Sequence, residues 1–345
     1  MRSARTLATI AAGAIAALAA FGLSACGEKS EPIRGASEGQ ALDLDLDFYV
    51  NADHAGIYTA IDRGFFNSAG LAVNPHVPSD PSAPIKEVAA GRADLAISYE
   101  PEVLLAREQG LDVIAVAALV NQPLTSLISL PGSGISGPGD LAGKTVATAG
   151  IPYQEDYLDA ILEKAGVQSD QVRVTNVGLN LLPALLGGKA DAILGGYSNV
   201  EGVDLTARGA SPSVTPVSQL GVPPYDELVL VAKSSRVKED PEPIRLFIEA
   251  LALGTKFAAA NPAAATQSIL GADKGLDPEL TAKEIAATLP LLYPAPDPKN
   301  PQAYGYMDPA QWETFAGFLA GAGVLSGVPD LDAVLTNELL PSPSG

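Results

Sequence analysis

Cysteine and histidine are nearly missing from this chain of 345 residues, which has one Cys and two His. Such a supply cannot build a Cys/His metal cage, a Cys–His catalytic pair or an internal disulfide. Basic residues are also scarce, with 21 Lys and Arg against 40 Asp and Glu, so the formal net charge is −19. A charge of this sign repels phosphate backbones, and we therefore expect no nucleic-acid partner.

A long apolar run occurs only near the N-terminus. Two arginines precede the apolar stretch Leu7–Leu23, and small residues then lead to Cys26. This order is typical of a secretory signal peptide, here over residues 1–25. The final Leu-Ser-Ala-Cys resembles a bacterial lipobox, which implies cleavage before Cys26, its lipidation and stable anchoring to the outside of the cell membrane. The alternative is a plain secretory signal with an incidental cysteine.

The rest of the chain has the composition of an ordered protein. Hydrophobic residues make up 47% of the sequence, which is enough for one or two cores. Residues 26–40 are polar and predict a lipidated, flexible tether. The length that remains predicts about two domains.

A weak internal repeat gives the expected fold class. In each copy a strand, a helix, a strand, a helix and a strand follow one another, and the last strand comes after a Gly-Arg/Lys-Ala-Asp segment. The first copy begins with the alternating stretch Leu42–Val50 and carries this segment at 91–94. The second begins at Lys144 and carries it at 188–191. The periodicity predicts an α/β protein of two lobes, each with a mainly parallel sheet.

Two later apolar stretches, Leu124–Leu130 and Glu227–Ala232, could carry the chain between the lobes. If both cross, lobe 1 consists of residues 41–125 and 230–345, including the C-terminal helices, and lobe 2 of residues 126–229. Two lobes joined by two crossover strands form a hinge. Ligands of open α/β sheets bind at the carboxyl ends of the strands, so we predict a site in the cleft between the lobes.

Three segments carry a resemblance to a known family, namely NADHAGIYTAIDRGFF (51–66), SDPSAPIKEVAAGRADLAISYEPEV (79–103) and GKTVATAGIPYQEDYL (143–158). They resemble the periplasmic solute-binding proteins for thiamine-pyrimidine precursors, whose wider relatives include sulfonate binders. The resemblance implies a type II periplasmic-binding-protein fold and delivery of a ligand to the permease of an ABC importer. It implies a small aromatic heterocycle as ligand, above all formylaminopyrimidine or hydroxymethylpyrimidine, with riboflavin, sulfonates or nitrate as alternatives.

The same family includes a eukaryotic enzyme that builds the pyrimidine with an active-site His and a Cys-rich motif. Cys26 is the one cysteine of this chain, so that motif is absent. We therefore expect a binding protein without enzymatic activity or a cofactor, acting as a monomer.

A flat heterocycle needs aromatic faces to stack on and a few oriented polar groups. Five tyrosines lie at predicted strand ends or turns and are candidates for the cleft, although each could equally be a packing residue: Tyr49, Tyr99, Tyr153, Tyr197 and Tyr225. The resemblance assigns Asn51 to the ligand, whereas a helix N-cap is its ordinary alternative. His54 either lines the cleft or only orders the turn.

Among the acids Glu201 is the main candidate, because the family has a Glu near this place. Its carboxylate would accept hydrogen bonds from an exocyclic amine, and the alternative is a solvated carboxylate at a helix start. Glu100, Gln122 and Ile151 complete the set, Ile151 because the helix after it offers free N–H groups. Acids in these segments speak against an anion as the ligand.

Overall fold

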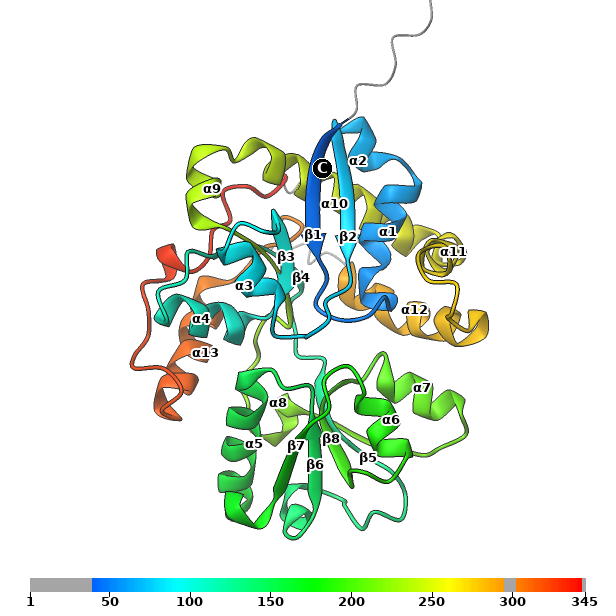
Figure 1. Ribbon diagram of the computed structural model, residues 1–345, viewed down its shortest axis with the longest axis vertical. Coiled ribbons are helices and arrows are strands. Elements are labelled where there is room, and N and C mark those ends of the chain that lie inside the picture. The colour runs from blue at the N-terminus through cyan, green and yellow to red at the C-terminus, as the bar shows by residue number, and fades with distance from the viewer. Residues whose placement is uncertain (1–38, 295–301, 343–345) are drawn as a thin grey trace, which may run out of the picture. The chain divides into compact units, whose positions relative to one another are not determined.

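The computed structural model describes residues 39–294 and 302–342 (Figure 1). The predicted signal peptide, Cys26 and nearly all of the predicted tether lie outside the described residues. Within the described part, none of the helices is long and apolar enough to cross a membrane.

The first sheet contains five described strands in the order β2-β1-β3-β10-β4. Their bounds are β1 Gln40–Asp45, β2 Leu71–His76, β3 Leu95–Ser98, β4 Ile114–Val120 and β10 Leu228–Ala232. β1 is parallel to β2 and β3, whereas β10 runs antiparallel to β3 and β4. The strand predicted over Leu42–Val50 ends at Asp45, although the alternation of the sequence continues to Phe48, and residues 46–51 connect β1 to the first helical turn.

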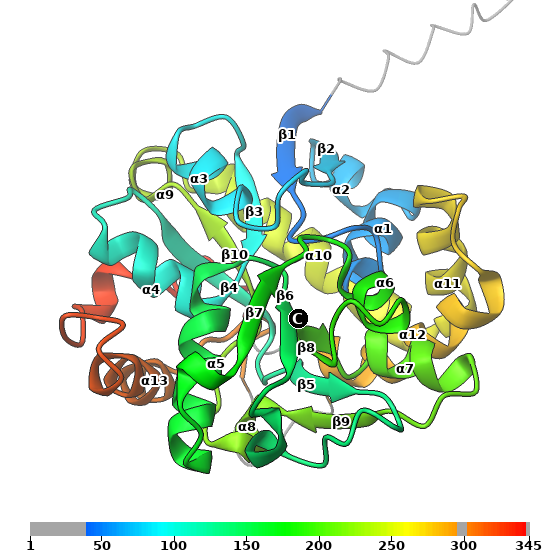
Figure 2. The same ribbon diagram turned by 60° about the horizontal axis from the view of Figure 1, so that its bottom comes forward.

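The second sheet repeats this arrangement in the order β7-β6-β8-β5-β9 (Figure 2). Its strands are β5 Thr125–Ser129, β6 Thr145–Thr148, β7 Arg173–Asn176, β8 Ala192–Tyr197 and β9 Ser213–Pro216. β6 is parallel to β7 and β8, and β5 is antiparallel to β8 and β9. The internal repeat of the sequence is thus a repeat of strand order.

The chain passes between the sheets at two places. It leaves the first sheet after β4 and enters the second with β5, and it returns from β9 to β10. The two apolar stretches that the sequence offers as crossovers are therefore β5 and β10 themselves, and the crossing residues lie just before each. We call residues 121–124 the first connection, residues 221–227 the second connection, and each sheet with its helices a lobe.

Helices cover both sheets. Those of the two repeats are α1 Ala55–Asp62, α2 Phe65–Ser68, α3 Pro84–Ala89 and α4 Glu100–Glu108, then α5 Pro152–Ala165, α6 Leu181–Leu186, α7 Glu201–Ala207 and α8 Val217–Leu220. Short 3-10 turns are η1 Ala52–His54, η2 Pro138–Leu141, η3 Ser169–Gln171 and η4 Leu331–Ala333. In Figure 2, α5 lies on one side of the second sheet and α6 and α7 on the other.

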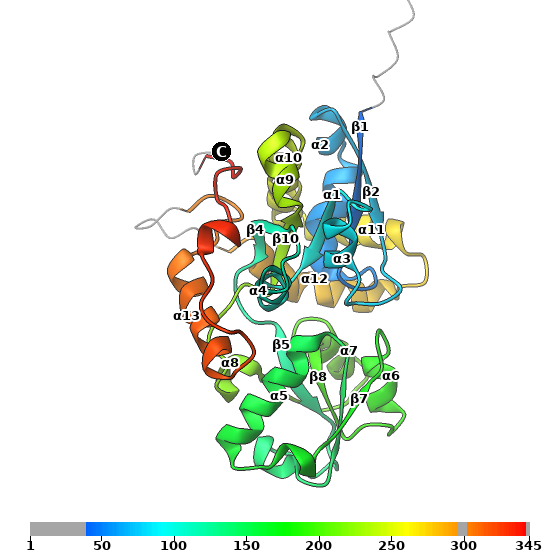
Figure 3. The ribbon, with the colours of Figure 1, turned by 60° about the vertical axis from the view of Figure 1, so that its left-hand side comes forward.

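The C-terminal helices pack on the first lobe. They are α9 Ser234–Glu239, α10 Glu242–Ala260, α11 Pro262–Ala272, α12 Pro278–Leu292 and α13 Pro309–Gly321. α10 crosses α1 so closely that a Cβ on Gly56 would lie 2.2 Å from Thr255 Oγ1, and glycine is needed there. α13 lies beside α4 (Figure 3). Its Trp312 is completely buried.

Candidate functional site

A narrow cavity lies where the carboxyl ends of strands from both sheets face each other. Residues after β1 and β3 line one wall, and residues at the ends of β6 and β8 line the other. The lining residues are Asp47, Phe48, Asn51, Tyr99, Ala149, Ile151, Tyr153, Gln154, Gly195, Tyr197, Val200 and Glu201. The space between the walls, including the open mouth, is about 360 Å³.

Glu201, at the start of α7, is buried rather than solvated, with 4% of its surface exposed. Its Oε1 accepts a hydrogen bond of 3.0 Å from the Tyr49 hydroxyl, and its Oε2 accepts one of 2.7 Å from the Tyr197 backbone N–H. Burial raises the pKa of Glu201, while these hydrogen bonds act in the opposite direction. Because Tyr49 follows β1 and Glu201 follows β8, this bond joins residues of the two lobes.

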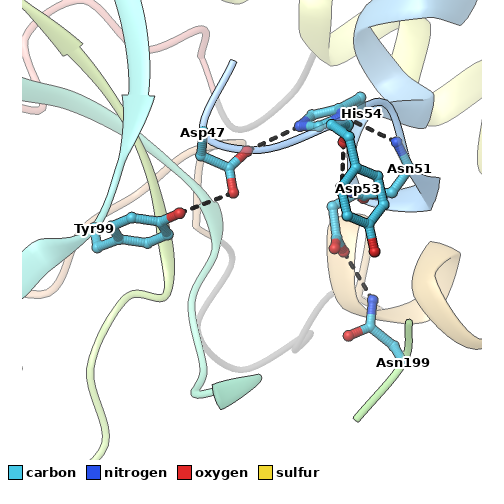
Figure 4. A network of polar contacts seen from close by, with 7 residues as sticks. Asp47, Asn51, Asp53, His54, Tyr99 and Asn199 are labelled. Carbon is cyan, nitrogen blue, oxygen red and sulfur yellow. Dashed lines mark hydrogen bonds and ion pairs between the residues drawn. The ribbon is translucent and has the colours of Figure 1, made fainter. Parts of the chain in front are cut away.

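Asp47 is the centre of a buried polar network beside the cavity (Figure 4). Its Oδ1 is 2.9 Å from His54 Nε2, and its Oδ2 accepts a bond of 3.1 Å from the Tyr99 hydroxyl. The backbone N–H of Asn51 donates to His54 Nδ1 at 3.3 Å. Since a backbone N–H can only donate, Nδ1 carries no proton and Nε2–H donates to Asp47. His54 thus contacts the lining residue Asp47, and it does not itself line the cavity.

Asn51 both caps a helical turn and lines the cavity. Its Oδ1 accepts a bond of 2.8 Å from the backbone N–H of Asp53, and its Nδ2 donates to the Tyr49 carbonyl at 3.0 Å. The N-cap alternative is thus realised in the structure. The same side chain also forms part of the cavity wall.

Aromatic rings form much of the cavity wall. Phe48, Tyr99, Tyr153 and Tyr197 line it. The rings of Tyr99 and Tyr153 meet edge to face with centroids 5.6 Å apart, although they belong to different lobes. Rings in this arrangement offer flat apolar surfaces with hydroxyls at their edges.

The structure brings together six of the predicted site residues on the cavity wall: Asn51, Tyr99, Ile151, Tyr153, Tyr197 and Glu201. Tyr49 and His54 are not among the lining residues, but they hydrogen-bond to two of them, Glu201 and Asp47. The other three do not reach the cavity. Glu100 accepts from the Asp226 backbone N–H at 2.7 Å, Tyr225 donates to Glu227 at 2.8 Å, and Gln122 is an exposed residue of the first connection.

Sequence reasoning did not single out six of the lining residues: Asp47, Phe48, Ala149, Gln154, Gly195 and Val200. Gln154 holds the turn after β6, since its Oε1 accepts from the Ala149 backbone N–H at 2.8 Å. Gly195 has φ +111°, and a Cβ there would lie 2.4 Å from Gln154 Nε2. Most of these residues are close neighbours of predicted ones, and that proximity was the available signal.

The electrostatics of the cavity favour hydrogen-bond donors in a ligand. Its lining includes the carboxylates of Asp47 and Glu201, and no Lys or Arg is among the described residues that line it. Over residues 39–294 and 302–342, no cluster of His, Cys, Asp and Glu has the arrangement of a metal site. An anion placed here would meet two acids and no counter-charge.

Two facing sheets with a cavity at their strand ends define the periplasmic-binding-protein fold. The alkanesulfonate-binding protein SsuA from Xanthomonas axonopodis pv. citri superposes with a TM-score of 0.66 over 87% of this chain and 100% of its own, at 14% identity. A similarity at that level of identity establishes the fold alone.

The chain belongs to the NMT1/THI5-like family, whose model matches residues 51–265. It is 35% identical over 288 residues to the formylaminopyrimidine-binding protein of Halalkalibacterium halodurans, which covers 82% of this chain and 87% of the relative. It is also 26% identical to the 4-amino-5-hydroxymethyl-2-methylpyrimidine phosphate synthase of Aspergillus parasiticus, over 61% of this chain and 65% of that enzyme.

Proposed function

We propose that this protein is the solute-binding component of an ABC importer and that its ligand is a thiamine-pyrimidine precursor, formylaminopyrimidine or hydroxymethylpyrimidine. The observation that carries the proposal is the buried Glu201 carboxylate in a cavity walled by aromatic rings. The relative that is 35% identical and binds formylaminopyrimidine by its name supports the choice of ligand.

The binding chemistry follows from the lining residues. An aminopyrimidine ring would lie against the tyrosine rings, with its exocyclic amine directed at Glu201. A carboxylate has about four acceptor positions. Glu201 uses two of them for Tyr49 and Tyr197, so acceptor capacity remains for a ligand.

Closure of the lobes is the proposed mechanism. Asn199, before α7, donates at 2.8 Å both to Asp53 Oδ1 and to Thr288 Oγ1 of the first lobe, in addition to the Tyr49–Glu201 bond. A ligand that contacts both walls is bound completely only when the lobes meet. It therefore stabilises the closed form by its differential affinity for that form, and the permease can recognise the closed form.

Two other functions are less well supported. A sulfonate or nitrate ligand would need a basic cleft, and here Asp47 and Glu201 line the cavity. A synthase of the kind found in the fungal relatives would need the Cys-rich motif, and Cys26 is the one cysteine of the sequence. We therefore propose binding and transport without catalysis.

A thermal-shift screen tests the ligand. Formylaminopyrimidine and hydroxymethylpyrimidine are expected to raise the Tm of the purified protein. A ligand that binds only the folded state adds about 2.7 kcal/mol to the free energy of unfolding when its concentration is 100 times its Kd. Riboflavin, taurine and nitrate at the same concentration serve as comparisons. A shift with taurine and none with either pyrimidine would replace our ligand by a sulfonate.

We also propose an extracytoplasmic location with anchoring through a lipidated Cys26, on the strength of the lipobox resemblance alone. Metabolic labelling with radioactive palmitate is expected to label the wild type but not Cys26→Ser. Labelling of this variant at the wild-type level would contradict lipidation at this residue.

A further inference from the structure

The two connections between the lobes are joined by the carboxylate of Glu227. Glu227 ends the second connection, and its Oε2 accepts from the backbone N–H groups of Leu124 and Thr125, at 2.7 and 2.8 Å. Its Oε1 accepts from Thr125 Oγ1 at 2.8 Å. These partners stand where the first connection enters β5, more than 100 residues away in sequence. The side chain is completely buried.

A fourth described donor, the Tyr225 hydroxyl, reaches Oε2 of Glu227 at 2.8 Å. Burial raises the pKa of Glu227, and each of the four hydrogen bonds opposes that effect. A carboxylate has room for about four donors, so the set matches an ionised Glu227. An amide in its place would keep an acceptor oxygen for the three donors at Oε2, but it is neutral, and its NH₂ group would make the Thr125 hydroxyl an acceptor.

The second connection is itself fixed to the first lobe. Asp226 Oδ2 accepts from Trp312 Nε1 of α13 at 2.7 Å, and its Oδ1 accepts from Gln311 Nε2 at 3.2 Å. The backbone N–H of Asp226 donates to Glu100 of α4 at 2.7 Å. Glu227 therefore ties a segment held by the first lobe to the first strand of the second lobe.

Contacts also run from Glu227 to the cavity. The Tyr225 ring meets Tyr157 with centroids 5.6 Å apart, and Tyr157 meets Tyr153 at 5.0 Å. Tyr153 lines the cavity. Thr125, whose hydroxyl donates to Glu227, also lies beside the Tyr153 side chain.

We propose that Glu227 is a positioning residue for ligand binding: it fixes the pivot about which the lobes close, and through Tyr225 and Thr125 it holds Tyr153 in place on the cavity wall. This inference rests on the proposed function. Under this proposal Glu227 does not contact the ligand but fixes the relative position of the two cavity walls.

The test measures the distance between the lobes in the ligand-free protein. Spin labels at Lys189→Cys and Lys238→Cys, both exposed and on different lobes, report this distance by pulsed electron resonance in a Cys26→Ser background. Glu227→Gln is expected to widen the distance distribution about twofold, because it replaces the charge-assisted hydrogen bonds that join the two connections by weaker neutral ones. Thr125→Val and Tyr225→Phe each remove one hydroxyl donor and are expected to widen it less. An unchanged width in all three variants would overturn the proposal.

Glu102→Gln is the matched control. Glu102 is also a buried carboxylate, but its partner is the Ser98 hydroxyl within the first lobe, so the width is expected to stay unchanged. If Glu227→Gln does not fold, the widths measured for Thr125→Val and Tyr225→Phe test the proposal. Thr125→Ser keeps the hydroxyl, so its distance distribution is expected to have the wild-type width.

Kinetics with formylaminopyrimidine add a second readout. Glu227→Gln is expected to raise the dissociation rate roughly tenfold, the effect of about 1.4 kcal/mol, with little change in the association rate. Equal rates in the variant and the wild type would contradict the link to Tyr153. If the wild type binds no pyrimidine but the variants still widen the distance distribution, the role of Glu227 at the pivot is supported and the proposed ligand is wrong.

Discussion

Replacing Glu201 by alanine is expected to weaken the binding of formylaminopyrimidine by about 1–3 kcal/mol, roughly a 5- to 150-fold rise in Kd. The variant removes the carboxylate that would accept from the exocyclic amine. It also removes the partner of the Tyr49 hydroxyl and of the Tyr197 backbone N–H. The contacts to the ligand and to Tyr49 exist only in the closed form, so the dissociation rate should account for most of the change. Titration calorimetry measures the effect.

Glu155→Ala is the matched control for this prediction. Glu155 also lies in the first turn of a helix beside the cavity, but it is exposed and does not line the cavity. The control makes the same change in charge, so it separates a loss of contact from a loss of net charge. We expect its Kd to stay within twofold of the wild type. Equal affinities of Glu201→Ala and the wild type would remove Glu201 from the site.

Raising the pH from 5 to 8 is expected to destabilise the folded protein. Burial raises the pKa of Glu102 and of Asp226 to about 7, and that of Glu284 to about 8. Between the ordinary carboxyl pKa and these values, the folded state keeps protons that the unfolded state has released. The free energy of unfolding therefore falls as the pH rises through this window. For Glu102 alone the contribution is on the order of 3 kcal/mol.

Urea denaturation at pH 5, 6, 7 and 8 measures this dependence. Glu102→Gln is neutral at every pH and keeps a partner for Ser98, so it is expected to flatten the profile and to exceed the wild type in stability at pH 8. Glu163→Gln, on an exposed residue of α5, is the control that should leave the profile unchanged. A wild-type stability that rises from pH 5 to pH 8 would contradict the assignment of buried, protonated carboxyls.

The architecture could be predicted from the sequence because it rests on local periodicity. The two copies of the repeat yield sheets with matching strand order, and the crossover stretches are the antiparallel strands β5 and β10. The alternation from Leu42 did not indicate where the strand ends, since Asp47 and Phe48 continue the pattern after β1 has stopped. Those two residues are part of the cavity wall, so the error in the strand end hid them.

The candidate site was only partly predictable, because a position at a strand end does not fix the direction of a side chain. Glu201 and Tyr99 point into the cavity from such positions. Glu100 occupies a similar position but hydrogen-bonds Asp226 of the second connection, and Tyr225 belongs to that connection and hydrogen-bonds Glu227. The partners of Glu227 in the first connection and β5, Leu124 and Thr125, are 103 and 102 residues away, and a single sequence carries no signal for such a pairing. Long-range contacts of this kind emerge only from the folded chain.

The most direct test of the account is a calorimetric titration of the purified protein with formylaminopyrimidine, followed by the same titration with an alkanesulfonate. The account predicts saturable binding of one pyrimidine per chain and no heat of binding from the sulfonate. Saturable sulfonate binding together with no response to the pyrimidine would contradict the central claim.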